Sequence, residues 1–312
     1  PLSFPASFVP TDTLPLTICD PEKLCDRLLA IVLTDVHLKS SSPLIKTRLE
    51  KAGVRSLNNL IDITNYCMLE LGFPCHVFDY DRIKTGKLII RRAKRGEKLV
   101  TLDNKECILE DQDIVIDDGS GRIIDLPGII GTENSVVTDQ TKRAILFIES
   151  NDPVAIRRTS MRLGVRTLAA TINEKQPDPE LAKTTLLRAL ELSRQEAQAK
   201  AASRLIDLYP HRMTPKSVTV SFDFIHTRLG MILQKEEIGE ILKSLDFGVT
   251  STSTHLTITP PSFRQFDIAL PEDIVEEVAR IYGYHNLPSR LMTGDLLLPS
   301  RQRELEVEEK IK

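Results

Sequence analysis

Three segments of the chain open with Ser or Asp followed by Pro, a pair that favours the start of a helix. The Ser or Asp side chain accepts free backbone N–H groups, and Pro fits the first helical position because its φ is already helical. Two of the segments also end at a Gly, which suits a helix end. These signals predict helices from Ser42-Pro43 to Gly53, from Asp152-Pro153 to Gly164, and from Asp178-Pro179 along a Leu/Ala pattern to about Leu205. A fourth helix is expected between Leu57 and Leu71.

Between these helices the pattern changes to short β-rich runs. The segment 87–131 alternates such runs with turn signals, and a further strand is expected from Leu28 to Val36. Helices interleaved with this pattern predict an α+β domain over residues 21–208, in which helices pack on a mixed or antiparallel sheet.

A second, smaller unit is expected over residues 216–290, after a linker at 209–215. It reads as a strand, two helices with the second closed by Gly248, a hairpin-like pair of strands, and a third helix. This order predicts a small winged-helix-like α+β domain. Residues 1–20 are interpreted as a linker or the tail of a preceding domain, and 291–312 as a linker and the start of a next one. The chain is therefore interpreted as a piece of a longer protein.

Composition narrows the function classes. The 312 residues carry a net charge of −3, so the overall charge gives no electrostatic attraction for nucleic acid. A local basic face could still bind nucleic acid. The five cysteines form no CxxC pair, which argues against a disulfide framework or a structural zinc site and favours a reducing cytoplasm. No apolar run is long enough to span a membrane.

Isolated polar residues near apolar runs are the first candidates for a site. Gly128 and Gly131 follow an apolar strand in "DLPGIIGTENS", where they form either a tight turn or a loop whose N–H groups approach a ligand. His76 follows Pro74-Cys75 and is either a turn residue or a working one. Glu149 ends the apolar strand "AILFIE" and points either to solvent or into a cleft.

Charged clusters are the second group of candidates. Two basic clusters are interpreted as solvated surface or as phosphate contacts; they comprise Arg91, Arg92, Lys94 and Arg95, and Arg157, Arg158, Arg162 and Arg166. Arg158 and Arg162 favour phosphate contact more, since they share a helix face. Four acids, Asp267, Asp273, Glu276 and Glu277, suit Mg²⁺ if they converge, or the positive end of a helix dipole if they do not.

Longer strings connect these candidates. The segments "GVRSLNNLIDITNYCMLELGFPCHVFDYDRI", "RRAKRGEKLVTLD", "PGIIGTENSVVTDQT", "DPVAIRRTSMRLGVRT" and "LTITPPSFRQFDIALPEDIVEEVARIYGYHNLPS" resemble the bacterial phenylalanyl-tRNA synthetase β subunit over about residues 20–290. The resemblance implies an (αβ)₂ heterotetramer that charges tRNA(Phe) using ATP and Mg²⁺, with the ATP site in the α subunit. It implies that residues 21–208 are a tRNA-editing domain that hydrolyses mis-acylated Tyr-tRNA(Phe). The chain alone is then at most an aminoacyl-tRNA ester hydrolase, without ATP-dependent ligation.

The resemblance also implies roles for single residues. Glu149 and the backbone N–H of Gly128 match the groups that read the tyrosine hydroxyl, and Gly131 belongs to the same substrate loop. His76 matches a histidine that orients water or the terminal adenosine, and Arg55 an arginine near the tRNA end. The amino-acid pocket is lined by Thr167 and Ala169, and the Mg²⁺-associated acids near the α subunit are Asp267, Asp273, Glu276 and Glu277. The implied reaction is ester hydrolysis by a positioned water, with no covalent nucleophile and no metal required for editing.

The chain departs from the family pattern beside the pocket. In "TLAATINEKQPDP" the usual acid, Ser, Arg, aromatic and Gly are replaced by Leu168, Ala170, Ile172, Asn173 and Gln176. "ESNDP" is about two residues short, and "SFRQFDI" has one extra residue before Asp267. An alternative is therefore a tRNA-docking module with a degenerate editing site. A DNA-binding winged-helix protein is a third interpretation, disfavoured by the net charge and the acidic third helix.

Overall fold

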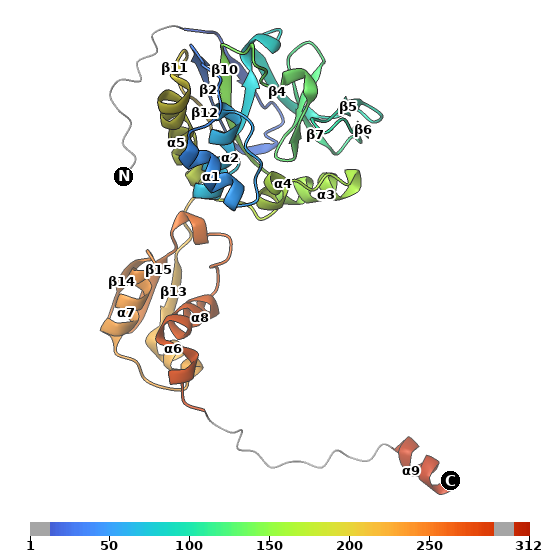
Figure 1. Ribbon diagram of the computed structural model, residues 1–312. Coiled ribbons are helices and arrows are strands. Elements are labelled where there is room, and N and C mark those ends of the chain that lie inside the picture. Colours follow the sequence, from blue (N-terminus) through green and yellow to red (C-terminus); the bar gives the residue numbers. More distant parts are fainter. Residues whose placement is uncertain (1–12, 290–302) are drawn as a thin grey trace. The chain divides into compact units, whose positions relative to one another are not determined.

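The computed structural model describes residues 13–289 and 303–312. The chain divides into two compact units, Pro1–Thr214 and Pro215–Lys312 (Figure 1). None of the described helices is long and apolar enough to cross a bilayer.

The first unit is centred on two long buried strands, β2 (Cys25–Thr34) and β10 (Ala144–Asn151), which pair antiparallel. β3 (His76–Asp79) extends this sheet beyond β10. On the other edge β2 pairs with β11 (Lys200–Ala201) and β12 (Ile206–Leu208). Both faces are covered, which explains why β2 and β10 are almost continuously apolar.

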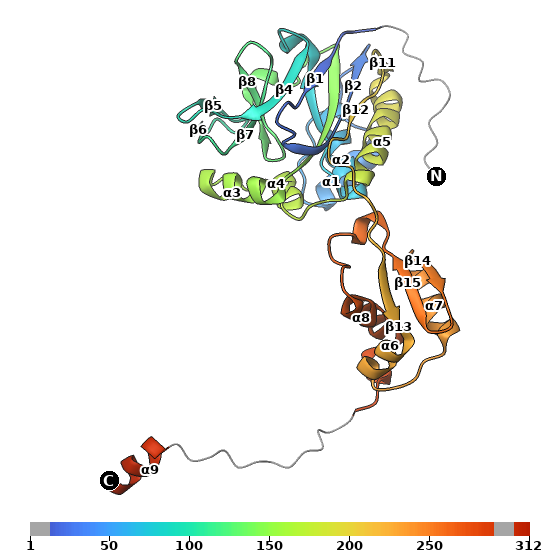
Figure 2. The same cartoon turned by 180° about the vertical axis from the view of Figure 1, so that it is seen from behind.

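Helices cover one face of this sheet, as Figures 1 and 2 show. They are α1 (Pro43–Lys51), α2 (Asn59–Leu71) and α5 (Pro179–Ala197). Their apolar side chains share a core with the alternate residues Leu29, Ile31 and Leu33 of β2.

A second sheet covers the other face. Its order is β1 (Thr17–Cys19), β4 (Lys87–Arg92), β7 (Ile114–Asp117), β8 (Ile123–Leu126) and β9 (Ile130–Gly131), with β1 parallel to β4 and the other pairs antiparallel. Leu28, Ala30 and Val32 of β2 pack toward this sheet. The hairpin β5 (Lys98–Val100) and β6 (Glu106–Ile108) and the helices α3 (Pro153–Leu163) and α4 (Leu168–Asn173) complete the unit. The predicted α+β class with a mixed or antiparallel sheet is confirmed.

The helix starts follow the predicted signals. Asp152 accepts the N–H groups of Val154 and Ala155 at the start of α3, and Asp178 accepts one at the start of α5. Ser42 precedes α1 as expected, although its side chain makes no capping bond. Gly164 ends α3 with a φ of 62°.

Three predicted boundaries are wrong. The third predicted helix ends at Ala197, not near Leu205, because β11 and β12 complete the open edge of β2. The first unit begins before the predicted residue 21, because β1 lies in the segment 1–20, interpreted as a linker or the tail of a preceding domain, and pairs with β4. Gly248 does not close a helix: α7 ends at Ser244, Asp246 takes the left-handed turn with a φ of 63°, and Gly248 begins a strand.

The second unit packs three helices with a three-stranded antiparallel sheet. Its elements are β13 (Val218–Ser221), α6 (Phe222–Leu229), α7 (Lys235–Ser244), β14 (Gly248–Ser251), β15 (His255–Thr259) and α8 (Pro271–Tyr282), and the sheet order is β13-β15-β14. The predicted order of elements in the small α+β unit is confirmed. A further helix, α9 (Arg303–Ile311), and four short 3₁₀ turns, Tyr80–Arg82, Glu133–Ser135, Ser262–Arg264 and Tyr284–Asn286, are also described.

Candidate functional site

The first unit contains two adjoining hollows near β3 and the β8–β9 loop. The outer hollow has a volume of about 280 Å³ and lies among α2, β3, the loop 129–132 and the start of α4. The inner hollow, of about 60 Å³, lies against Gly128 and Glu149. His76, Gly131 and Ala169 line both. Together they form one cavity with a wide outer part and a narrow inner end.

Glu149 reaches the inner end because of strand alternation. It lies on the same face of β10 as Ile145 and Phe147, which pack toward the second sheet. Its side chain is buried, and its Oε1 accepts the backbone N–H of Gly128 at 2.7 Å. Burial raises the pKa of Glu149 to about 8, although the N–H of Gly128 favours the ionised form.

The loop at Gly128 is held tightly. Gly128 has a φ of 70°, and a Cβ there would lie 2.8 Å from Asn151 Nδ2 and 2.9 Å from Ile156 Cδ1. Its carbonyl accepts a hydrogen bond of 3.0 Å from Asn173 Nδ2. Glycine is required by both backbone conformation and space.

His76 begins β3, opposite Phe147 of β10. Its ring packs edge-on against Phe78, with the ring centroids 4.4 Å apart. A Cβ on Gly131 would lie 3.0 Å from His76 Cε1, so the two residues face each other closely. Burial lowers the pKa of His76 to about 4, which makes the imidazole neutral at pH 7.

Thr167 connects the start of α4 to the loop between β8 and β9. Its hydroxyl donates to the carbonyl of Ile129 at 2.6 Å and accepts the N–H of Ala170 at 3.0 Å. Ala169 follows on the first turn of α4 and leaves space in the cavity. The altered segment therefore folds as a short helix against the loop, and Asn173 at its end holds Gly128.

The structure brings six of the predicted editing residues together: His76, Gly128, Gly131, Glu149, Thr167 and Ala169. Arg55 is not among the residues that line the cavity and is exposed between α1 and α2. The catalytic and binding roles of all seven stay predictions.

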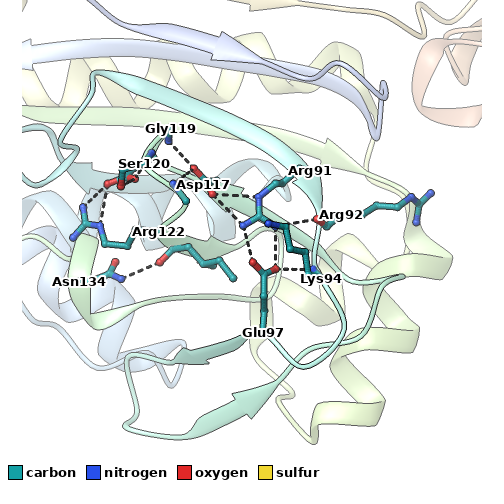
Figure 3. Close-up of polar contacts among 12 residues, drawn as sticks. Arg91, Arg92, Lys94, Glu97, Asp117, Gly119, Ser120, Arg122 and Asn134 are labelled. Atoms are coloured by element: carbon teal, nitrogen blue, oxygen red, sulfur yellow. Dashed lines mark hydrogen bonds and ion pairs between the residues drawn. The ribbon is translucent and has the colours of Figure 1, made fainter.

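The basic clusters are partly neutralised. Figure 3 shows the Arg91 guanidinium between Glu97 and Asp117, at 3.0 Å from each carboxylate. Arg162 pairs with the buried Asp113. These two arginines hold the fold together and are poorly available for phosphate, whereas Arg158 is exposed on α3.

The four predicted Mg²⁺ acids do not converge. Asp267 and Glu277 both pair with Arg264, at 2.9 and 2.8 Å, and Asp273 accepts two backbone N–H groups before α8. Glu276 is exposed. Within residues 13–289 and 303–312, no three His, Cys, Asp or Glu side chains lie together as metal ligands would. This arrangement of the acids therefore does not fit a bound cation, and no step is assigned to one.

Sequence reasoning missed Asp125. This residue of β8 is 2 % exposed and lines the inner hollow with Glu149. Its Oδ1 has no hydrogen-bond partner in the described part of the chain. The sequence did contain a pattern that could have identified it: Asp125 lies within the apolar run "RIIDLPG", and a charged residue inside a buried strand requires an explanation.

Comparisons with known proteins agree on one family. The B3/4 domain family matches residues 24–198, and the tRNA synthetase B5 domain matches residues 218–284. The chain is 38 % identical to the phenylalanine–tRNA ligase β subunit of Carboxydothermus hydrogenoformans over 89 % of this chain and 35 % of the relative. For the same subunit of Geobacillus kaustophilus the identity is 40 %, over 85 % of this chain and 33 % of the relative. The chain thus spans about a third of the length of these relatives.

A solved structure was also matched, the N-terminal fragment of the phenylalanyl-tRNA synthetase β subunit from Pyrococcus horikoshii. It is 18 % identical over 88 % of this chain and 76 % of that chain, at a TM-score of 0.42, which is too low to support an argument. The family assignment rests on the domain matches and the sequence identities. The chain belongs to the family of phenylalanine–tRNA ligase β subunits, with a B3/4 domain at residues 24–198 followed by a B5 domain at residues 218–284.

Proposed function

We propose that the B3/4 domain hydrolyses the ester that joins a mis-attached tyrosine to tRNA(Phe). The observation that supports this most is the buried carboxyl of Glu149 at the inner end of the cavity, held by the N–H of Gly128 at 2.7 Å. A binding site for phenylalanine rejects tyrosine poorly, since tyrosine only adds a hydroxyl. A second site that binds the hydroxyl removes the error, because phenylalanine offers the buried carboxyl no hydroxyl partner.

In this proposal the tyrosine ring occupies the outer hollow, between Ala169 and Gly131, with its hydroxyl toward Glu149. The ester then lies near His76. Neutral imidazole accepts a proton from a water as the water oxygen adds to the ester carbonyl. The proton passes to the ribose oxygen as the C–O bond breaks, so the products are tyrosine and tRNA with a free ribose hydroxyl. Neither a covalent nucleophile nor a metal is needed.

The role of the whole protein extends the proposal. As a β subunit, the full-length protein would assemble with an α subunit into an (αβ)₂ enzyme in the cytoplasm. That enzyme would attach phenylalanine to tRNA(Phe), with ATP and Mg²⁺ used by the α subunit. Arg55, exposed outside the cavity, would contact the tRNA end rather than the amino acid.

The test is deacylation of Tyr-tRNA(Phe) by the 312-residue chain, with Phe-tRNA(Phe) as the control substrate. Wild type is expected to release tyrosine much faster than phenylalanine. Glu149→Ala and His76→Ala should each remove most of this activity. Glu272→Ala, which removes an exposed acid of the second unit, is the matched control and should leave it unchanged. Hydrolysis that survives in both cavity variants would contradict the site.

The alternative of a tRNA-docking module with a degenerate site is motivated by the altered segment at 168–176. Here Asn173 is bonded to the Gly128 carbonyl, and Gln176 adopts a φ of 56°, a conformation that favours glycine. A folded chain that binds tRNA(Phe) but releases neither amino acid would support docking alone.

A further inference from the structure

Asp125 is a second buried carboxyl at the inner end of the cavity. It lies in β8 opposite Gly131 of β9, so it comes from the strand next to the substrate loop. The side chain is 2 % exposed, and it lines the inner hollow together with Glu149. Its Oδ1 has no hydrogen-bond partner among the described residues. An unpaired buried polar atom is costly, which points to a partner that a ligand supplies.

A phenol hydroxyl needs two partners when it is buried. Its proton must be accepted, and its oxygen must receive a hydrogen bond from a donor. Glu149 can accept the proton. The backbone N–H of Gly128 already donates to Glu149 Oε1, so it is not the donor for the phenol oxygen in this arrangement. His76 also lines this hollow but is assigned to the ester, and the buried amide of Asn151, whose Nδ2 has no partner among the described residues, does not line it. The phenol oxygen therefore still needs a donor at the inner end.

A protonated carboxyl supplies that donor. No lysine or arginine is among the described residues that line the inner hollow, so nothing there compensates two negative charges. Burial and the charge of Glu149 raise the pKa of Asp125 well above its usual range. Asp125 therefore keeps its proton at neutral pH, and Glu149, which receives the N–H of Gly128, is the first of the two carboxyls to ionise as pH rises.

We propose that Asp125 determines specificity in the proposed editing site by donating a hydrogen bond from its protonated carboxyl to the phenol oxygen, while Glu149 accepts the phenol proton. The proposal rests on the proposed function. A carboxylic acid that stays neutral in an apolar site can act as such a donor. Phenylalanine has no hydroxyl to hydrogen-bond with either carboxyl, so both carboxyls contribute to its rejection.

The experiment compares wild type with Asp125→Ala and Asp125→Asn in the 312-residue chain. Rates are measured for Tyr-tRNA(Phe) and Phe-tRNA(Phe). We expect Asp125→Ala to lower the ratio of kcat/KM for Tyr-tRNA(Phe) to kcat/KM for Phe-tRNA(Phe) by roughly tenfold to a hundredfold. Only the value for Tyr-tRNA(Phe) should fall. Asp125→Asn keeps a donor of similar shape and should restore most of the ratio. A purely structural role would instead slow both esters alike.

Asp113→Asn is the matched control, because Asp113 is also 2 % exposed but lines neither hollow. It should leave the ratio unchanged. Asp125→Ala removes a buried acid whose Oδ1 has no partner among the described residues, so we expect this variant to fold as well as wild type. Thermal unfolding checks this.

A second readout does not depend on hydrolysis. Tyrosyl and phenylalanyl amides of 3′-aminoadenosine carry no cleavable ester, and their binding is measured by calorimetry. Wild type should prefer the tyrosyl amide, and Asp125→Ala should lose most of that preference. If wild type is selective and Asp125→Ala remains as selective, the role of Asp125 is overturned while the editing function stands. If wild type neither hydrolyses the ester nor prefers the tyrosyl amide, both are overturned.

Discussion

Replacing Glu149 by Gln should stabilise the first unit while it abolishes the proposed editing. Glutamine keeps the shape of the side chain, and its Oε1 can still accept the N–H of Gly128. It carries no charge, so the cost of burying a carboxylate disappears. The Nε2 of the new amide also offers a donor to the unpaired Asp125 Oδ1.

The size of the effect follows from linkage. Burial raises the pKa of Glu149 from its ordinary value of 4.5 to about 8. The native state therefore holds a proton that the unfolded state has lost between these two values. The stabilisation from this group is complete below the unfolded pKa and is lost as pH rises through the folded pKa. Wild type should lose about 1.4 kcal/mol of unfolding free energy per pH unit over this range, relative to Glu149→Gln.

Between pH 5.5 and 8 the difference should grow by about 3 kcal/mol, or about 6–12 °C in Tm for a unit of this size. Urea and thermal unfolding followed by circular dichroism measure it, and since the second unit is the same in both proteins, the difference belongs to the first. Glu133→Gln removes an exposed glutamate and should show a flat difference within about 0.5 kcal/mol. Parallel pH curves for wild type and Glu149→Gln would refute the reasoning, because Glu149 would then be ionised in the cavity.

Three further variants test the site and the second unit. Gly128→Ala should lower the unfolding free energy by about 3 kcal/mol or more, because the new Cβ meets two side chains at 2.8 and 2.9 Å. Gly96 has a similar φ but open space around it, so Gly96→Ala should lower the unfolding free energy by only about 1 kcal/mol. Denaturant unfolding measures both values. His76→Ala should lower kcat for the tyrosine ester by about a hundredfold, and an unchanged kcat would exclude it from proton transfer. Glu277→Ala leaves Arg280 without its carboxylate and Arg264 with Asp267 alone, and should lower the unfolding free energy of the second unit by about 2 kcal/mol. The exposed Glu272→Ala should lower it by less than about 0.5 kcal/mol, and equal losses would contradict the burial argument.

Local chemistry in the sequence was sufficient for most of the elements. Asp152 and Asp178 cap their helices as predicted, since a helix start needs only nearby acceptors and a compatible φ. Helix ends were less predictable. The run after Ala197 has good helical propensity, yet it pairs with β2, because an open strand edge offers backbone partners that local propensity does not anticipate.

The sequence by itself determined the α+β class, the family and a set of candidate residues, because these depend on spacing and residue type along the chain. Only the tertiary structure decided which candidates meet. The side chain of Glu149 lies on the face of β10 that packs against the second sheet and accepts a hydrogen bond from Gly128, whereas Arg55 lies outside the cavity. The tertiary structure paired the predicted metal acids with arginines and backbone N–H groups, and it revealed Asp125 beside Glu149. Burial and opposite charges arise from contacts between distant segments, so the packed structure alone sets the protonation of these carboxyls.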